Sequence, residues 1–307
     1  MAQLAPAAHR IGTGPTPRDD EPYLEFRELS KIYAADDGPV RALDGVTIGQ
    51  RKREFLSILG PSGCGKSTLL MIAAGLIPAS HGQVAVQGER IVKPRTDVGI
   101  VFQNPVLLEW RTALGNIMLQ AEARKLDRAV AEKRAYELLG SVGLNGFEHK
   151  YPDQLSGGMR QRVSICRALI HNPPQLLMDE PFGALDALTR DQLVLDIQRI
   201  WNEARMTVLF ITHSVSEAVF LSDRVIVMTP RPGRIDRVID IDLPRPRERG
   251  SQQFAAHEGQ FRASCSVRRR RGLVLIELIA ETAPRIRFRS RGSWQTLELF
   301  RVAASHD

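Results

Sequence analysis

The sequence predicts an α/β protein in which a mostly parallel sheet is covered by helices. Three short apolar segments, residues 55–59, 176–178 and 208–211, have the character of buried strands, and helical patterns separate them. Each segment runs directly into glycine or polar residues. Ligands of such sheets gather at the carboxyl ends of the strands. We therefore expect the functional site where these three segments end.

The first of these strands continues into a glycine-rich loop that fits the pattern G-x-x-x-x-G-K-[ST]. Apolar residues at helical spacing follow the loop, from Leu69 to Ala73. In a strand-loop-helix arrangement, backbone N–H groups and the helix N-terminus surround phosphate oxygens. Lys66 would reach the terminal phosphates of a nucleotide, and Ser67 would offer its hydroxyl to Mg²⁺. The predicted nucleotide-binding residues are Gly60, Pro61, Ser62, Gly63, Cys64, Gly65, Lys66, Ser67 and Thr68.

Two adjacent carboxylates, Asp179 and Glu180, follow the second strand. Alone, such a pair more often forms an acidic turn that ends a strand. Beside a phosphate-binding loop the two take different roles, because one can hold Mg²⁺ through its waters while the other polarises the attacking water as a general base. We predict the metal role for Asp179 and the base for Glu180.

The tripeptide Ser156-Gly157-Gly158 opens a helical pattern, with Ser156 at the N-cap. Two glycines at a capped helix start leave backbone N–H groups free for an anion. Taken alone, the tripeptide indicates an ordinary N-cap.

Other segments set the organisation of the chain. Residues 104–152 carry helical periodicity and predict an inserted helical subdomain, extending to about residue 170. Two strand-like segments, residues 224–228 and 235–241, flank the turn residues Pro230 to Gly233 and predict a β-hairpin. We expect residues 1–22 to form a disordered arm, residues 23–246 to form the main domain, and residues 247–307 to be a basic tail of uncertain structure.

Charge and composition exclude several classes of protein. The formal net charge is +7, but residues 247–307 hold twelve Arg against six Asp or Glu and so account for +6 of it. The main body is nearly neutral, so nucleic acid is not an expected partner. We expect the basic tail to be solvated or disordered, and contact of the tail with anionic lipid or nucleic acid is the alternative. No apolar run approaches the roughly 20 residues of a membrane span. The three cysteines are far apart in sequence, which suggests neither a disulfide framework nor a paired-cysteine metal site and agrees with a reducing cytoplasm.

The order of the motifs decides the family. Residues 155–162, Leu-Ser-Gly-Gly-Met-Arg-Gln-Arg, lie between the phosphate loop and Asp179-Glu180 and resemble the signature of ABC ATPases. The resemblance covers about residues 23–245 and implies a P-loop NTPase (RecA-like) core with an antiparallel β region and an inserted helical subdomain. It also implies ATP and Mg²⁺ as ligands. The implied roles are catalysis for Glu180, contact with the γ-phosphate for His213, Mg²⁺ and γ-phosphate sensing for Gln103, communication between subunits for Asp186, and stacking on adenine for Tyr33.

The same resemblance implies partners. In this family the signature of one subunit closes over nucleotide held by another, so we expect a head-to-tail pair with ATP at the interface, to which Ser156, Gly157 and Gly158 contribute. Residues 104–111, with Trp110 in a loop, fall where such subunits receive membrane permeases. An extracytoplasmic solute-binding protein would complete an import system, and this chain would lie at the cytoplasmic face of the bacterial inner membrane.

The subgroup is indicated by residues 108–112 and 228–234, which resemble the nitrate, sulfonate and taurine importers, although Glu109 stands where those proteins commonly have Pro. Two alternatives stay open. A non-transport ABC ATPase would carry a long coiled coil or a second cassette, whereas only residues 69–154 separate the phosphate loop from the signature. An exporter cassette is the other alternative, and the transported solute is left open.

Overall fold

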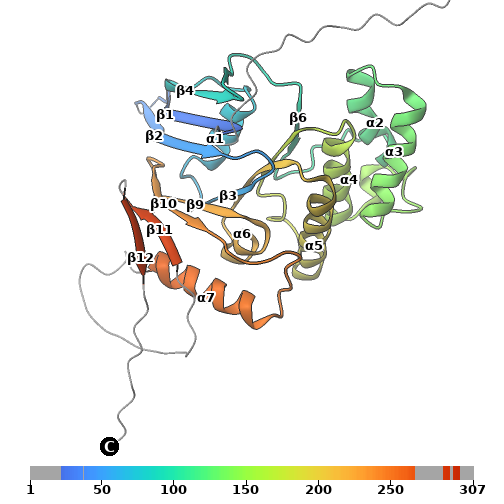
Figure 1. The fold of residues 1–307 in the computed structure, drawn as a ribbon. Helices are drawn as coiled ribbons and strands as arrows, with labels where there is room; N and C mark the ends of the chain where they lie inside the picture. Colours follow the sequence, from blue (N-terminus) through green and yellow to red (C-terminus); the bar gives the residue numbers. More distant parts are fainter. Residues whose placement is uncertain (1–21, 37, 267–285, 291–292, 298–307) are drawn as a thin grey trace, which may run out of the picture.

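The computed structural model describes residues 22–36, 38–266, 286–290 and 293–297. It confirms the α/β prediction and shows an eight-stranded sheet, a four-stranded sheet and flanking helices (Figure 1). The predicted N-terminal arm, except for Pro22, lies outside the described residues, as does about half of the predicted basic tail. Within the described part of the chain, no helix is both long enough and apolar enough to cross a membrane.

The larger sheet carries the three predicted strands side by side. Its order is β12-β11-β10-β9-β3-β8-β7-β6, and the strands from β9 to β6 run parallel. The centre consists of β3 (Phe55–Leu59), β8 (Thr207–Thr212) and β7 (Gln175–Asp179), in which every residue is buried. Strands buried on both faces need continuous apolar runs, which explains why these segments stand out in the sequence.

The remaining strands of this sheet lie on either side of its centre. Strand β6 (Val98–Val101) lies beside β7, and β9 (Arg224–Met228) lies beside β3. Strand β10 (Ile235–Asp240) pairs antiparallel with β9, so the predicted β-hairpin is confirmed. Strands β11 (Ile286–Ser290) and β12 (Ser293–Leu297) extend the antiparallel edge.

The second sheet is antiparallel and supplies the predicted antiparallel region. Its order is β2-β1-β4-β5, with bounds Leu24–Tyr33 for β1, Val40–Gln50 for β2, His81–Val86 for β4 and Glu89–Arg90 for β5. Helix α1 (Lys66–Ala73) buries Leu69, Leu70 and Ile72 in an apolar cluster that it shares with β1, β2 and β3. This packing fixes the start of α1 beside both sheets.

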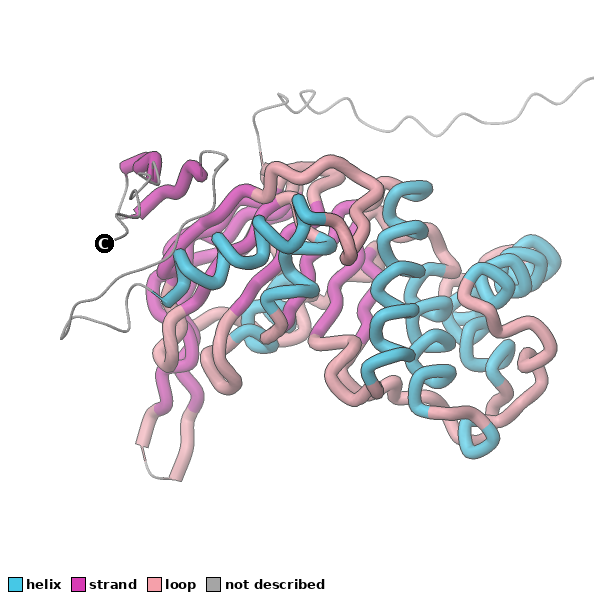
Figure 2. The backbone as a smooth tube through the Cα atoms, turned by 90° about the horizontal axis from the view of Figure 1, so that it is seen from below, coloured by secondary structure: helices cyan, strands magenta, loops and turns pink. Residues whose placement is uncertain are grey.

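The predicted helical insertion is present. It contains α2 (Ala113–Ala123), α3 (Arg128–Ser141), the 3₁₀ turn η1 (Pro152–Gln154) and α4 (Gly157–Leu169). Figure 2 shows helices gathered at one end of the molecule, beside the strands. Helix α5 (Ala187–Ala204) and α6 (Val215–Leu221) follow β7 and β8. The N-caps of α2 to α6 are Thr112, Asp127, Ser156, Asp186 and Ser214, whose side-chain oxygens accept from backbone N–H groups.

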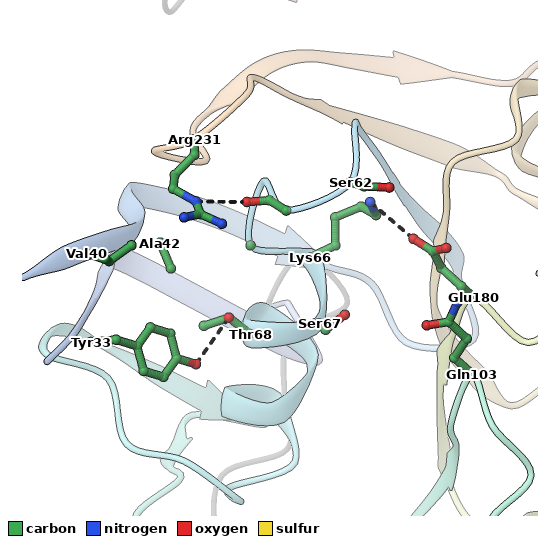
Figure 3. Close-up of a pocket in the computed structure, with 12 residues that line it drawn as sticks. Tyr33, Val40, Ala42, Ser62, Lys66, Ser67, Thr68, Gln103, Glu180 and Arg231 are labelled. Atoms are coloured by element: carbon green, nitrogen blue, oxygen red, sulfur yellow. Dashed lines mark hydrogen bonds and ion pairs between the residues drawn. The ribbon is translucent and has the colours of Figure 1, made fainter. Parts of the chain in front are cut away.

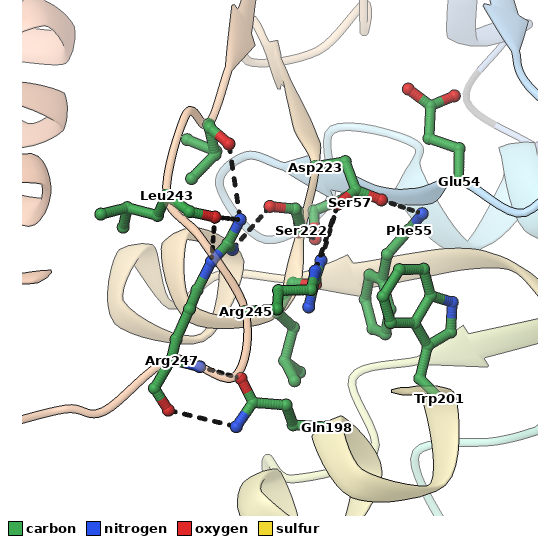
Figure 4. A network of polar contacts seen from close by, with 12 residues as sticks. Glu54, Phe55, Ser57, Gln198, Trp201, Ser222, Asp223, Leu243, Arg245 and Arg247 are labelled. Atoms are coloured by element: carbon green, nitrogen blue, oxygen red, sulfur yellow. Dashed lines mark hydrogen bonds and ion pairs between the residues drawn. The ribbon is translucent and has the colours of Figure 1, made fainter. Parts of the chain in front are cut away.

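The residue that follows the predicted domain boundary at residue 246 is buried in the structure. The Arg247 side chain is only 5% exposed and donates to backbone carbonyls at the end of α6 and around Leu243 (Figure 4). Helix α7 (Gln252–Ser266) then packs on α6, where the rings of Phe254 and Phe220 lie 5.6 Å apart. Helix α7 is therefore packed on the main body of the protein.

Candidate nucleotide-binding site

The predicted phosphate loop joins β3 to α1 and depends on glycine at two positions. Gly63 and Gly65 adopt φ angles of 75° and 100°, a left-handed conformation that favours glycine. A Cβ atom on Gly65 would also lie 2.7 Å from the Leu43 side chain and 2.8 Å from the carbonyl oxygen of Ala42. Strand β2 therefore packs directly against the loop, and only glycine fits there.

Lys66 lies at the centre of this loop. Its Nζ donates to the carbonyl oxygens of Gly60 at 2.9 Å and Pro61 at 3.1 Å, and it forms a 3.2 Å ion pair with Glu180 Oε1 (Figure 3). The lysine is only 4% exposed. A buried ammonium group with several donors, held at the mouth of the loop, is suited to bind phosphate oxygens.

An open cavity of about 350 Å³ surrounds the loop. It brings the phosphate loop together with residues from β1, β2, the segment after β6, the end of β7 and the β9–β10 turn. The lining residues are Tyr33, Val40, Ala42, Ser62, Gly63, Gly65, Lys66, Ser67, Thr68, Gln103, Glu180 and Arg231.

Asp179 and Ser67 bring oxygen atoms together beside the cavity, and Gln103 is one of the residues that line it. Asp179 ends β7, and its Oδ1 accepts a 3.1 Å hydrogen bond from Ser67 Oγ. Burial raises the pKa of Asp179, although the Ser67 hydrogen bond works against that shift. Gln103 follows the neighbouring strand β6 and also lines the cavity. Carboxylate, hydroxyl and amide oxygens are ligands that suit Mg²⁺, so these residues fit the predicted metal.

Mg²⁺ is compatible with a site that supplies few protein ligands. The described residues contain no group of three or more His, Cys, Asp or Glu side chains that could hold a metal ion. Mg²⁺ needs no such group, because it usually keeps several waters and takes one or two carboxylates plus substrate phosphates.

Glu180 and His213 meet at the ends of β7 and β8. The Oε2 atom of Glu180 lies 2.9 Å from His213 Nδ1, and the backbone N–H of Glu180 donates to the carbonyl oxygen of Ile211. Glu180 adopts a φ of 42°, which is uncommon for a residue with a side chain. Strained conformations of this kind cluster at functional sites. The geometry aims the Glu180 carboxylate at Lys66 and the cavity.

Tyr33 stands at the opposite end of the cavity, where β1 ends. It is 37% exposed, and its hydroxyl lies 3.2 Å from Thr68 Oγ1. Lys31 Nζ is 5.1 Å from the centre of the ring. A partly exposed ring anchored to the residue after Ser67 is placed to stack on a base whose phosphates lie in the loop.

The predicted signature residues do not join this cavity. Ser156 caps α4 by accepting from the N–H of Met159, and a Cβ on Gly157 would meet no atom within 4 Å. Gly158 is buried against the start of α5, and a Cβ atom on it would lie only 2.3 Å from the Thr189 side chain. Asp186 caps α5 by accepting from the N–H of Thr189, and this hydrogen bond lowers its pKa. The signature and Asp186 thus form a second group apart from the phosphate loop.

Comparison with known proteins decides the family. The ABC transporter family model matches residues 43–183. An uncharacterized ABC transporter ATP-binding protein from Methanocaldococcus jannaschii is 47% identical over 231 residues, which cover 75% of this chain and 86% of the relative. The chain belongs to the ABC transporter ATP-binding proteins. The resemblance drawn from its signature is therefore confirmed, and so is the expected ATPase class.

Other relatives have named transport roles. The aliphatic sulfonates import ATP-binding protein SsuB of Bacillus cereus is 43% identical, covering 75% of this chain and 91% of the relative. The bicarbonate transport ATP-binding protein CmpD of Synechococcus elongatus is 44% identical, covering 76% and 86%. Among solved structures, a dimeric ATP-binding cassette bound to ADP and Pi in a post-hydrolysis state is similar, with a TM-score of 0.65 and 31% sequence identity. The match covers 72% of this ABC ATPase and all of that chain.

Three residues that line the cavity lie outside the predicted site, namely Val40, Ala42 and Arg231, and only Arg231 among them is charged. Arg231 lines the cavity, and its Nε donates to the carbonyl oxygen of Gly63 at 3.2 Å. In the sequence, Arg231 belongs to the turn between two strands and to the segment 228–234 that indicates the subgroup, and neither pattern assigns it to the nucleotide site. Nothing local in that turn indicates a contact with a loop 168 positions earlier.

Proposed function

We propose that this ABC ATPase powers solute import through a separate membrane permease. The observation that carries the ATPase chemistry is the convergence of Lys66, Ser67, Asp179, Glu180 and His213 at the carboxyl ends of three adjacent strands. The import role is supported by the sulfonate and bicarbonate transport relatives.

In this proposal, Glu180 is the general base that accepts a proton from the attacking water. His213 Nδ1 fixes one carboxylate oxygen, and Lys66 Nζ holds the other, so the carboxylate is already oriented toward the cavity. Lys66 also binds the terminal phosphates of ATP, while Tyr33 holds the base. Ser67, Asp179 and Gln103 would hold Mg²⁺, whose charge, when bound, stabilises the negative charge on the transferring phosphoryl group.

The active unit in this proposal is a head-to-tail dimer. Ser156 and Gly157 are exposed at the start of α4 and lie outside the cavity of their own chain. A second copy is therefore needed to bring a signature to each phosphate loop, with Asp186 close to the same interface. Dimeric structures of a related cassette support this arrangement.

The permease would bind at the loop of residues 104–111. The side chain of Asn116 is buried and exchanges hydrogen bonds with both backbone groups of Leu108, and Arg167 donates to the carbonyl oxygens of Pro105 and Val106. These contacts hold a rigid loop from which Trp110 projects, 74% exposed. A fixed, exposed Trp is an expected anchor for a partner protein.

The residues immediately before this loop contact both halves of the proposed ATPase site. Gln161 of α4, the helix that begins at the signature, donates to the carbonyl oxygen of Phe102. Gln103 follows immediately and lines the cavity. Movement of the loop on permease binding can therefore reach the nucleotide and the signature together.

We assign the solute to small anions or zwitterions of the sulfonate, nitrate, taurine and bicarbonate kind. Sulfonate and bicarbonate come from the relatives, and nitrate and taurine come from residues 108–112 and 228–234. An extracytoplasmic solute-binding protein would deliver the solute, and this subunit would lie at the cytoplasmic face of the membrane.

The permease proposal is tested with Trp110→Glu in the complex reconstituted into liposomes. A charge at the exposed Trp110 position of the docking loop should reduce ATP-dependent transport and permease-stimulated hydrolysis at least about 10-fold, because a buried interface would have to accept an unpaired carboxylate. ATP affinity of the isolated subunit should not change. Val92→Glu is the matched control, because Val92 is 79% exposed outside the loop. Undiminished transport by Trp110→Glu would refute the docking site.

A further inference from the structure

We propose that Arg231 contacts the α-phosphate of bound ATP, as a nucleotide-binding residue supplied by the β9–β10 turn. The inference rests on the proposed nucleotide site and adds a cation that lies outside its sequence motifs. Three observations carry it: the turn is rigidly attached to the phosphate loop, the guanidinium group lines the cavity, and it has no carboxylate partner there.

The turn that carries Arg231 is closed on itself. The N–H of Thr229 donates to the carbonyl oxygen of Arg234 at 2.9 Å, and Thr229 Oγ1 donates to the carbonyl oxygen of Pro232 at 3.2 Å. Thr229 Oγ1 also accepts from the N–H of Arg234 at 3.1 Å. The backbone that presents Arg231 is therefore well defined.

The turn is also packed against the nucleotide-binding loop. The N–H of Gly233 donates to the carbonyl oxygen of Ala42 at 2.9 Å. A Cβ atom on Gly233 would lie 2.0 Å from the carbonyl oxygen of Cys64, so the two backbones touch and only glycine permits it. The position of Arg231 relative to the phosphate loop is set by backbone contacts on both sides.

The guanidinium group of Arg231 has donors to spare. Its Nε is used by the carbonyl oxygen of Gly63, and an Nη atom lies 3.3 Å from where a Gly63 Cβ would be. Within the described part of the chain, no carboxylate lies within 4.0 Å of this guanidinium, whereas Arg234 in the same turn is paired with Asp44. Arg231 can hold the loop and still offer its Nη groups to an anion.

Charge balance in the cavity favours such an anion. Among the described residues that line it, only Lys66, Glu180 and Arg231 are charged, and Lys66 is already paired with Glu180. Arg231 therefore adds an unneutralised positive charge at a site intended for a polyanion. A charge-assisted hydrogen bond from Arg to a phosphate oxygen is among the stronger polar contacts in proteins.

The position within the cavity selects the α-phosphate. Figure 3 shows Arg231 with Val40 and Ala42 on the far side of the loop from the Lys66 ammonium group and Glu180. Tyr33, the proposed base-binding ring, lies below that same side. In a nucleotide that reaches from Tyr33 to Lys66, the α-phosphate is attached to the ribose and lies farthest from the Lys66 ammonium group, so we place it on the side of the loop where Arg231 lies (Figure 3).

The test compares Arg231→Gln and Arg231→Lys with the parent and with Arg234→Gln, which removes a charge from the same turn outside the cavity. Affinities are measured for ATP, for ADP and for the two diastereomers of ATP that carry sulfur on the α-phosphate. Arg231→Gln should weaken ATP and ADP by the same factor, about 10-fold, because both nucleotides carry an α-phosphate. Arg231→Lys should fall in between, and Arg234→Gln should stay within about twofold of the parent.

The diastereomers separate direct contact from a merely structural role. An arginine that bonds one α-phosphate oxygen contributes to the preference between the diastereomers, so Arg231→Gln should change their affinity ratio severalfold. Equal weakening of both diastereomers would overturn the proposal in favour of a role in shaping the loop. Weakening of ATP alone would overturn it in favour of the γ-phosphate. A parent chain that fails to bind ATP would instead refute the proposed function itself.

Discussion

Replacing Glu180 by Gln separates nucleotide binding from hydrolysis more sharply than any other single change at the site. The amide keeps the size of the side chain and can still bond His213 Nδ1, which lies 2.9 Å from the carboxylate in the parent. It cannot accept a proton from water at neutral pH. The substitution therefore removes the proposed base and leaves the surrounding geometry in place.

The expected loss in turnover is roughly 10²- to 10⁴-fold, the range for a general base. At 1.36 kcal/mol for each factor of ten, the barrier rises by about 2.7–5.4 kcal/mol. The affinity for ATP, in contrast to the turnover, should not fall. Lys66, only 4% exposed, loses its ion pair with Glu180 and keeps only the carbonyl oxygens of Gly60 and Pro61. An unpaired buried cation attracts phosphate more strongly, so ATP affinity should be equal to the parent's or tighter.

The measurements are steady-state hydrolysis in the permease complex and equilibrium binding of ATP to the isolated subunit. ATP should also trap Glu180→Gln as a dimer, which light scattering detects, because the nucleotide at the interface is no longer consumed. Glu89→Gln, an exposed glutamate on β5, is the matched control. Hydrolysis by Glu180→Gln within threefold of the parent would refute the assignment of the base. A marked loss of ATP affinity would refute the account of the Lys66–Glu180 pair.

The other predictions concern binding and stability. Lys66→Ala should weaken ATP binding at least about 10-fold in equilibrium titrations, because the buried cation that faces the terminal phosphates is lost; unchanged affinity would contradict its role. Arg247→Met should lower the free energy of unfolding by about 3 kcal/mol in denaturant titrations, because the carbonyl oxygens of α6 and Leu243 lose a buried donor. The exposed Arg90→Met should be nearly neutral, and equal stability of the two variants would show that water replaces the guanidinium group.

The sequence was sufficient for those parts of the fold and site that are encoded locally. Each central strand is a continuous apolar run because both of its faces are buried, and the phosphate loop is one short segment whose glycines are required by its backbone. The adjacent pair Asp179-Glu180 can be placed at a strand end from the sequence because it directly follows the apolar run of residues 176–178. Since parallel strands align their carboxyl ends, the strand order brings these segments and His213 together.

The C-terminal boundary of the main domain could not be predicted from a local sequence pattern. Arg247 begins a stretch rich in arginine, and composition alone suggested a solvated tail. The structure buries that guanidinium, and burial lowers the pKa of Arg247 to about 9. The carbonyl oxygens that compensate for this burial come from the end of α6 and from residues 241–243. A buried charge is tolerated only where such partners converge, and no local pattern predicts that convergence.

The sequence by itself therefore determined the family signature, the phosphate loop and the adjacent carboxylates to which we assign the metal and base roles, because each is a short segment with its own backbone geometry. Only the tertiary structure decided what surrounds them. Arg231 reaches Gly63 because β9 lies beside β3 in the sheet, and Asn116 and Arg167 fix the Trp110 loop from two different helices. Contacts between distant segments depend on strand order and helix packing, which are set by the burial of the whole core and not by any one segment.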